Sequence, residues 1–140
     1  MNTPDSGLLM FRNTMRITEG HLEEFRGAIE RAVDFVEQHG PQLMVEVFID
    51  EERLLAHSFQ LYRDSDAVRE HWKLSDPYIQ EVMAHCRVEH FEVFGTPDEG
   101  VASGIRESLA DQSAPVFSPR LTGFVRFGAP HRPVGRAAPR

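Results

Sequence analysis

Hydrophobic residues along the first two thirds of the chain repeat with two different periods. A period of two, typical of half-buried strands, occurs in residues 8–17, 42–50, 54–63 and 87–94. A period of three to four, typical of helices with one buried side, occurs in residues 20–39 and 65–86. The order β-α-β-β-α-β predicts an α+β, ferredoxin-like sheet with both helices on one face.

Prolines and glycines mark where these elements end. Gly40 and Pro41 end the first helix, because glycine commonly follows the last helical turn and proline does not continue it. Pro77 lies inside the second helical segment and disfavours helical geometry at the residue before it. We therefore expect two helical segments with a bend at residues 75–76, and a gap beside Trp72 that opens a pocket.

The last third of the chain carries a weaker pattern. It predicts a short helix at residues 98–110 and an edge strand at residues 115–127, since Pro115 and Pro119 cannot both pair within a central strand. The predicted organisation is a ferredoxin-like domain at residues 7–95, a C-terminal extension of a short helix and an edge strand at residues 96–127, and a flexible tail at residues 128–140.

One face of the predicted sheet is almost wholly apolar and should lie under the helices. Its members are Phe11, Asn13, Met15, Ile17, Leu43, Val45, Val47, Ile49, Leu55, His57, Phe59, Leu61, Phe91 and Val93. Asn13 and His57 are the polar exceptions, and the topology places them on adjacent central strands. A buried polar group without a partner costs about 1–3 kcal/mol. The partner of each is the backbone, water, the other residue or a ligand.

The opposite face mixes charged residues with large apolar ones, among them Met44, Phe48, Tyr62 and Phe94. Monomers rarely expose a large contiguous apolar patch. We therefore expect a homodimer that forms through this sheet face. The alternative is a monomer whose C-terminal segment covers the face.

Composition and charge narrow the function classes. The 140 residues carry a formal net charge of -7, and residues 1–127 hold 12 basic against 22 acidic side chains. An acidic body argues against nucleic-acid binding, which depends on neutralising phosphates. The single cysteine, Cys86, forms no intrachain disulfide, and the sequence shows neither a signal peptide nor a membrane span. We expect a cytoplasmic protein with no membrane partner.

Common catalytic and cofactor motifs are missing from the sequence. It contains no phosphate-binding loop, no G-x-G-x-x-G, no G-x-S-x-G, no His-x-x-x-His and no Cys-x-x-Cys, and the histidines and cysteine of "EVMAHCRVEH" straddle a helix end and a strand. These absences argue against nucleotide, dinucleotide, serine-hydrolase and metal chemistry, so we expect no bound metal or cofactor.

Two stretches carry a resemblance to a known family. "LLMFRNTMRITEGHLEEFRGAIE", the strand pair that follows it, and "SDAVREHWKLSDPYIQEVM" resemble the antibiotic biosynthesis monooxygenase (ABM) domain family. The resemblance covers about residues 7–95. It implies a dimeric α+β barrel with a pocket between the sheet and the helices of each subunit.

The family includes monooxygenases that oxidise quinols and polyketides with O₂ alone. The resemblance therefore implies that Asn13 binds a phenolic or peroxy oxygen, that Trp72 walls the ring, and that His71 or His57 is the base, since histidine accepts protons near neutral pH. Further residues expected to touch the small aromatic substrate are Phe11, Phe59, Tyr78, Val82 and His85.

Two alternatives remain open from the sequence. The chain can be a non-catalytic dimer that binds a small hydrophobic ligand, with Trp72 as a core residue and His71 facing solvent. The haem-degrading branch of the family is the weaker alternative. Val82 stands where that branch has its axial histidine, and His85 lies one helical turn further on.

Overall fold

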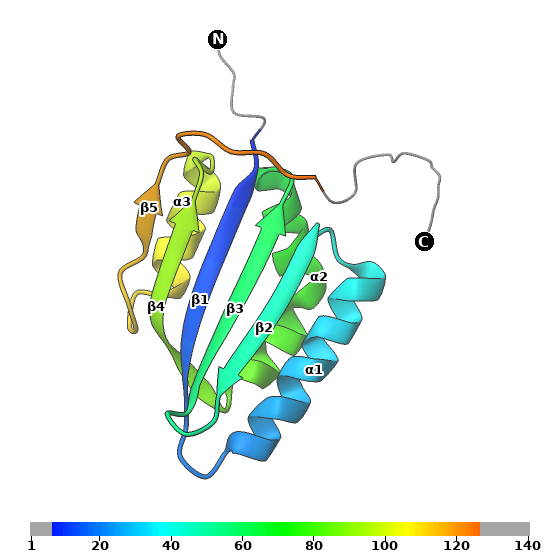
Figure 1. Cartoon of the computed structure of the whole chain (residues 1–140), viewed down its shortest axis with the longest axis vertical. Coiled ribbons are helices and arrows are strands. Elements are labelled where there is room, and N and C mark those ends of the chain that lie inside the picture. Colours follow the sequence, from blue (N-terminus) through cyan, green and yellow to red (C-terminus); the bar gives the residue numbers. More distant parts are fainter. Residues whose placement is uncertain (1–6, 127–140) are drawn as a thin grey trace.

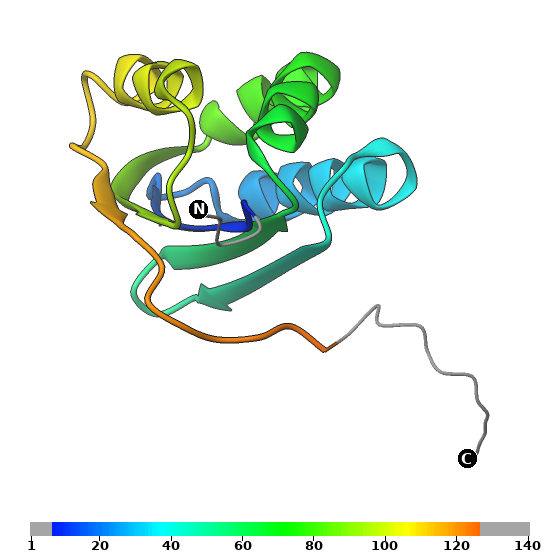
Figure 2. The ribbon, with the colours of Figure 1, turned by 90° about the horizontal axis from the view of Figure 1, so that it is seen from above.

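The computed structural model describes residues 7–126, which form one twisted sheet with three helices on a single side (Figures 1 and 2). The strands are β1 (Leu9–Ile17), β2 (Met44–Asp50), β3 (Leu55–Tyr62), β4 (Cys86–Phe94) and β5 (Val116–Ser118). The helices are α1 (Leu22–His39), α2 (Ser65–Met83) and α3 (Glu99–Ser108). The sheet order β2-β3-β1-β4-β5 confirms the α+β, ferredoxin-like arrangement with a C-terminal helix and strand added to it.

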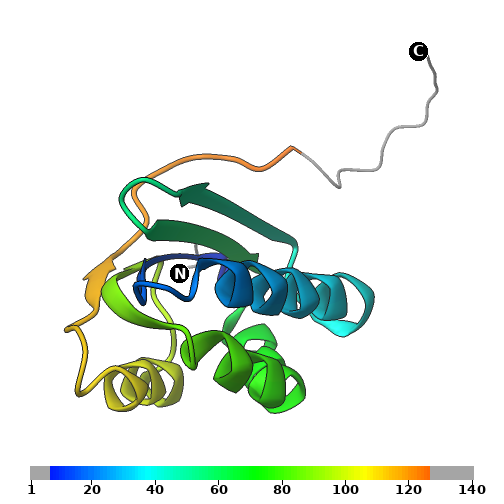
Figure 3. The ribbon, with the colours of Figure 1, turned by 90° about the horizontal axis from the view of Figure 1, so that it is seen from below.

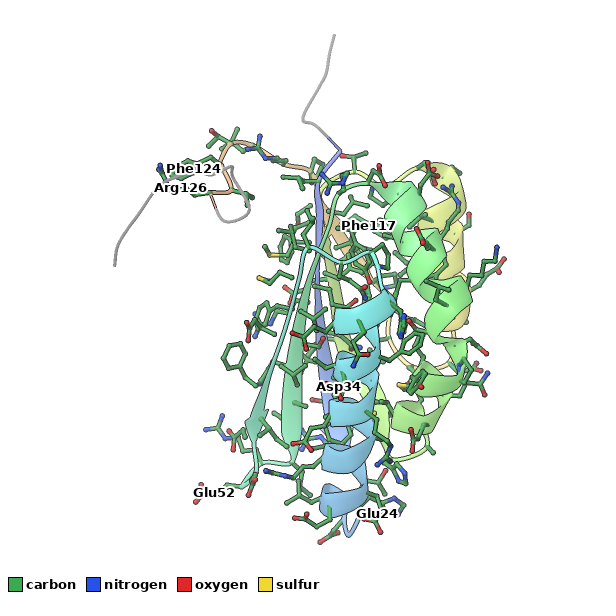
Figure 4. All side chains as sticks on the ribbon, turned by 90° about the vertical axis from the view of Figure 1, so that its right-hand side faces the viewer. Glu24, Asp34, Glu52, Phe117, Phe124 and Arg126 are labelled. Carbon is green, nitrogen blue, oxygen red and sulfur yellow. The ribbon has the colours of Figure 1, made fainter. Side chains whose placement is uncertain are left out.

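Each helix buries one side against the sheet. α1 buries Phe25, Ala28 and Val36, as the period of its apolar residues predicts. Two apolar clusters result: one surrounds Phe11 and Tyr62 under α2 and α3, and the other surrounds Met15 and Phe25 under α1. Side chains from the helices and the sheet meet in the layer between them (Figure 4).

The expected break in α2 is wrong, because α2 runs as one helix through Pro77. Asp64 caps its first turn by accepting a hydrogen bond from the backbone N–H of Ala67 at 2.9 Å. Val68 and Val82 are buried on either side of the proline. Proline removes one backbone N–H, and the packing of both halves on the sheet offsets that loss.

The side-chain alternation is as predicted on β1 and opposite to the prediction on β3. Asn13 of β1 pairs with Ser58 of β3, so Ser58 and its alternating neighbours Gln60 and Tyr62 face the helices. His57 therefore faces away from the helices. We call the side of the sheet without helices the open face.

A bulge in β4 moves a further residue to the helix side. Thr14 pairs with His90 and Met15 pairs with Val88, which leaves Glu89 as an extra residue in β4. The alternation with Phe91 and Val93 predicts Val88 on the face opposite the helices. Because of the bulge, Val88 is buried under the helices instead.

The C-terminal extension contains the expected helix and a shorter strand than expected. β5 has three residues, pairs in parallel with β4, and lies between Pro115 and Pro119. Residues 119–126, which we call the arm, then pass across one end of the open face (Figures 2 and 3). The expected tail at residues 128–140 lies outside the described residues.

None of the described helices is long and apolar enough to cross a membrane.

Candidate functional site

A cavity with two lobes lies between the sheet and the helices. The larger lobe, about 210 Å³, is lined by Phe11, Tyr62, Trp72, Val88, Phe91 and residues of α3. The smaller lobe, about 100 Å³, lies under α1 and is lined mainly by Ala32, Val33, Val36, Val45, Val47 and Val82. Both lobes are lined by Asn13, Gln60, His71, Ile79 and Met83, so they meet at these residues.

His71 is the titratable group at this junction. It lies seven positions after Asp64, almost two turns into α2, and it faces the cavity. Its Nδ1 lies 2.9 Å from Nε2 of Gln42 and 3.0 Å from Oγ of Ser75. Burial lowers the pKa of His71 to about 4, because the charged imidazolium loses hydration there. The ring is therefore neutral at pH 7.

The Gln42 amide determines which ring nitrogen of His71 carries the proton. If Gln42 donates its NH₂ group, Nδ1 accepts and the proton lies on Nε2. If the amide is rotated, Oε1 accepts from Nδ1–H and Nε2 becomes the basic nitrogen. In the first orientation Oε1 of Gln42 is buried without a hydrogen-bond partner.

A chain of hydrogen bonds from β3 forms the wall opposite His71. The Tyr62 hydroxyl donates to Oε1 of Gln60, and Nε2 of Gln60 donates to Oγ of Ser58 at 3.3 Å. Burial raises the pKa of Tyr62, so its phenol keeps the proton. The Gln60 side chain is thus held at both ends of its amide.

Asn13 lies beside this wall at the junction of the lobes. Its Oδ1 is buried and has no hydrogen-bond partner among the described residues. An unpaired buried amide oxygen costs about 1–3 kcal/mol, so a ligand that donates a hydrogen bond gains affinity here.

Trp72 follows His71 on α2 and walls the larger lobe. Its indole packs against α3 at Gly104, where the absence of a side chain lets the ring approach. Phe11 and Phe91 complete the aromatic wall, with their ring centroids 5.5 Å apart in an edge-to-face contact.

Five of the nine residues named from the sequence line the cavity: Phe11, Asn13, His71, Trp72 and Val82. The structure does not place His57, Phe59, Tyr78 and His85 there. His57 and Phe59 lie on the open face because β3 has the opposite alternation. Phe59 contacts Phe48, and the guanidinium of Arg12 lies 5.5 Å from its ring centroid.

Tyr78 and His85 are held elsewhere by other rings. Tyr78 stacks on Phe35 of α1 with a centroid distance of 4.5 Å, on the outer surface of the helix pair. His85 follows α2, and its Nδ1 lies 3.1 Å from Nδ1 of His21. Neither side chain therefore lines the cavity.

Sequence reasoning missed most of the polar residues at the junction. Gln42, Ser58, Gln60, Tyr62 and Ser75 were expected on solvent-facing or unassigned positions. The alternation of Ser58, Gln60 and Tyr62 against the apolar Leu55, Phe59 and Leu61 was the available signal, since it shows a strand with one polar side.

Within residues 7–126 no group of three or more histidine, cysteine, aspartate or glutamate side chains is arranged to hold a metal ion. Val82, at the position of the haem branch's axial histidine, lines the smaller lobe with an aliphatic side chain. The described residues therefore do not fit the haem ligand that the branch requires.

Comparisons with known proteins give similar folds at low sequence identity. No family model matches the sequence, and no curated protein matches it either. The solved structure of MupZ from Pseudomonas fluorescens matches with a TM-score of 0.67 and 17% identity over 89% of this chain and 99% of that one. This share extends past residues 7–95, so the match with MupZ includes part of the C-terminal extension.

Two further structures cover the ferredoxin-like part. SnoaB, a cofactor-independent oxygenase from Streptomyces nogalater, matches with a TM-score of 0.55 and 16% identity over 66% of this chain and 95% of that one. A candidate antibiotic biosynthesis monooxygenase from Caulobacter crescentus matches with a TM-score of 0.54 and 14% identity over 63% of this chain and 86% of that one. The chain therefore has the fold of the antibiotic biosynthesis monooxygenase proteins, as the sequence resemblance predicts.

Proposed function

We propose that this protein is a monooxygenase that oxidises a small aromatic or quinol-type compound with O₂ and without a bound cofactor. The observation that carries the proposal is a buried, neutral His71 at the junction of the two lobes, which are both lined also by Asn13 with its unpaired amide oxygen. The fold shared with SnoaB, a cofactor-independent oxygenase, supports it.

The reaction needs a base, because a phenolate gives up an electron to O₂ more readily than a phenol. In the rotated orientation of the Gln42 amide, Nε2 of His71 accepts the phenolic proton and Oε1 of Gln42 gains a partner. A pKa near 4 leaves the ring unprotonated and able to accept a proton at neutral pH, and it also makes the ring a weaker base than an ordinary histidine.

The chemistry balances with the substrate as the only reductant. When a hydroquinone becomes a hydroxyquinone, one oxygen atom of O₂ enters the product at a ring carbon, and the other leaves as water with the two hydrogens that the substrate loses. The substrate loses four electrons and O₂ gains four. One O₂ is consumed for each product molecule.

Oxygen consumption with a panel of hydroquinones and anthrone-like phenols tests the proposal. We expect turnover by the wild-type protein, and a decrease of about 10²-fold or more in His71→Ala because general-base catalysis contributes about 10²–10⁴-fold. Asn13→Ala should also slow the reaction. Tyr78→Phe is the matched control, since Tyr78 lies on the outer surface, and should keep the wild-type rate.

The pH profile adds a second readout. The rate should stay level through neutral pH and fall as the pH approaches 4, where His71 takes up a proton. Binding of the panel without oxygen consumption at any pH would contradict the proposal and support a non-catalytic protein that binds a small hydrophobic ligand.

We also propose a homodimer that forms through the open face. This face exposes Met10, Phe48 and Phe94, with Phe48 57% exposed. The arm does not account for them: Leu121 and Phe124 within it are themselves 92% and 78% exposed, and Phe124 lies away from the helices and sheet (Figure 4). A second copy stacked on the open face would cover these apolar side chains.

A further inference from the structure

The two lobes of the cavity differ in the chemistry of their walls. The larger lobe is lined by the rings of Phe11, Tyr62, Trp72 and Phe91, whereas α1 and β2 line the smaller lobe with valine, alanine and isoleucine. Aromatic walls favour a flat ring through offset and edge-to-face contacts. Aliphatic walls favour a chain.

The volumes of the lobes set the size of what each can hold. A dry apolar cavity of about 150 Å³ is large enough for benzene, which corresponds to about 25 Å³ per carbon atom. The larger lobe of about 210 Å³ therefore holds one ring with small substituents. The smaller lobe of about 100 Å³ is too small for a second ring and holds about four aliphatic carbons, beyond which a chain passes into the open space between α1 and β2.

The polar side chains determine how a ligand lies across the lobes. Asn13, Gln60 and His71 line both lobes, so the polar group of a ligand lies where the lobes meet. We propose that the ligand of this site is a single-ring phenol or hydroquinone with an aliphatic chain of about four carbons, the ring in the larger lobe and the chain under α1. The inference rests on the proposed function for the identity of the polar group, and on the shape of the cavity for the rest.

Gly104 determines the width of the larger lobe, in which the ring is proposed to lie. A Cβ atom at this position would lie 2.9 Å from Cζ3 and 3.0 Å from Cη2 of Trp72, which is too close for either group to stay in place. Gly104→Ala therefore moves the indole toward the cavity. Ala32 of α1 lines the smaller lobe. A larger side chain at this position would occupy the space proposed for the ligand's aliphatic chain.

Trp72 is the only tryptophan of the sequence and lines the cavity, so its fluorescence reports binding directly. The titration uses hydroquinone and its ethyl, butyl and hexyl derivatives, with anthrone as a rigid three-ring probe. It is carried out under argon, so that no oxidation takes place and binding is separated from turnover.

We expect affinity to rise about fourfold for each methylene group, as burial of about 0.8 kcal/mol per CH₂ requires, and to stop rising near four carbons. Ala32→Leu should move this limit to one or two carbons and leave unsubstituted hydroquinone unaffected. Gly104→Ala should weaken all members of the series by a similar factor, because every member places its ring in the same lobe. Melting curves of both variants establish that they fold.

Three results would overturn the inference: affinity that does not depend on chain length, the same limit in Ala32→Leu as in the wild type, or anthrone binding as tightly as butylhydroquinone. A chain-length limit without oxygen consumption in air keeps the inference and rejects the monooxygenase proposal. Oxygen consumption with anthrone, together with no preference for alkyl chains, rejects the inference and keeps the monooxygenase proposal.

Discussion

The helix side and the open face of the sheet differ from the usual pattern in where β3 places its polar and its apolar side chains. Under the helices, β3 contributes the polar side chains of Ser58 and Gln60 to a buried wall, whereas its apolar Phe59 lies on the open face. A sheet with one face on a core and one in water has the reverse pattern. On the helix side, these polar groups line the cavity proposed to bind a ligand. On the open face, the exposed rings have no cover among the described residues.

Local departures from the usual pattern are expected at functional sites rather than at random. β1 also places a polar residue on the buried side, since Asn13 lies between the buried Phe11 and Met15. The comparison thus separates apolar residues that hold the fold together from apolar residues that are available for a partner.

The largest difference between the faces is expected for a pair of phenylalanines. Phe11 is 2% exposed and Phe48 is 57% exposed. Phe11→Ala should lower the free energy of unfolding by about 3–5 kcal/mol, as for other buried phenylalanines. Phe48→Ala should change it little in dilute protein but reduce dimer formation. Urea unfolding and light scattering measure the two effects, and equal losses of stability would remove the distinction between the faces.

The next effect is the pH dependence of stability due to His71. Its pKa is about 4 in the folded protein and about 6.5 when unfolded, so the unfolded state binds the proton first. Stability is therefore unchanged above pH 6.5 and falls as the pH is lowered from 6.5 to 4. The loss reaches about 3 kcal/mol, from 1.36 kcal/mol for each pKa unit.

Comparison with His71→Gln isolates this contribution, because carboxylates titrate equally in both proteins. The wild-type curve of unfolding free energy against pH should be steeper than that of the variant between pH 6.5 and 4. Parallel curves would show that His71 is not a buried neutral base.

The smallest effect is expected for the hydroxyl of Tyr62. Tyr62→Phe leaves Oε1 of Gln60 without its donor in a buried position, which costs about 1–3 kcal/mol. Thermal unfolding measures the loss. Phe at position 62 keeps the packing on Phe11, whose ring centroid lies 5.0 Å from that of Tyr62. No change in stability would mean that water or Gln42 donates a hydrogen bond to Oε1 of Gln60 in place of the Tyr62 hydroxyl.

The order of the elements, and the limits of most of them except β5, followed from the sequence because periodicity depends on local burial. The alternation of β1 was predicted correctly for the same reason. The alternation of β3 was not, since both of its faces carry apolar residues and the more apolar one lies outside. The bulge at Glu89 and the continuity of α2 through Pro77 depend on tertiary packing, which one sequence does not reveal.

The site was predictable only in part, for the same physical reason. Asn13, His71 and Trp72 stood out as polar or aromatic groups within apolar patterns. Gln42 and Ser75 did not, because each reaches His71 from a position where a polar residue is ordinary: after Pro41 in one case, and within a helix in the other. Only the folded arrangement brings them together.

The short strand β5 has a consequence for how the sheet can grow. It occupies part of the outer edge of β4 with three residues, and Pro115 and Pro119 on either side offer no backbone N–H to a neighbouring chain. Fibre-like extension by strand addition is therefore obstructed at this margin. At this edge, two molecules can therefore associate through side chains more readily than through main-chain hydrogen bonds.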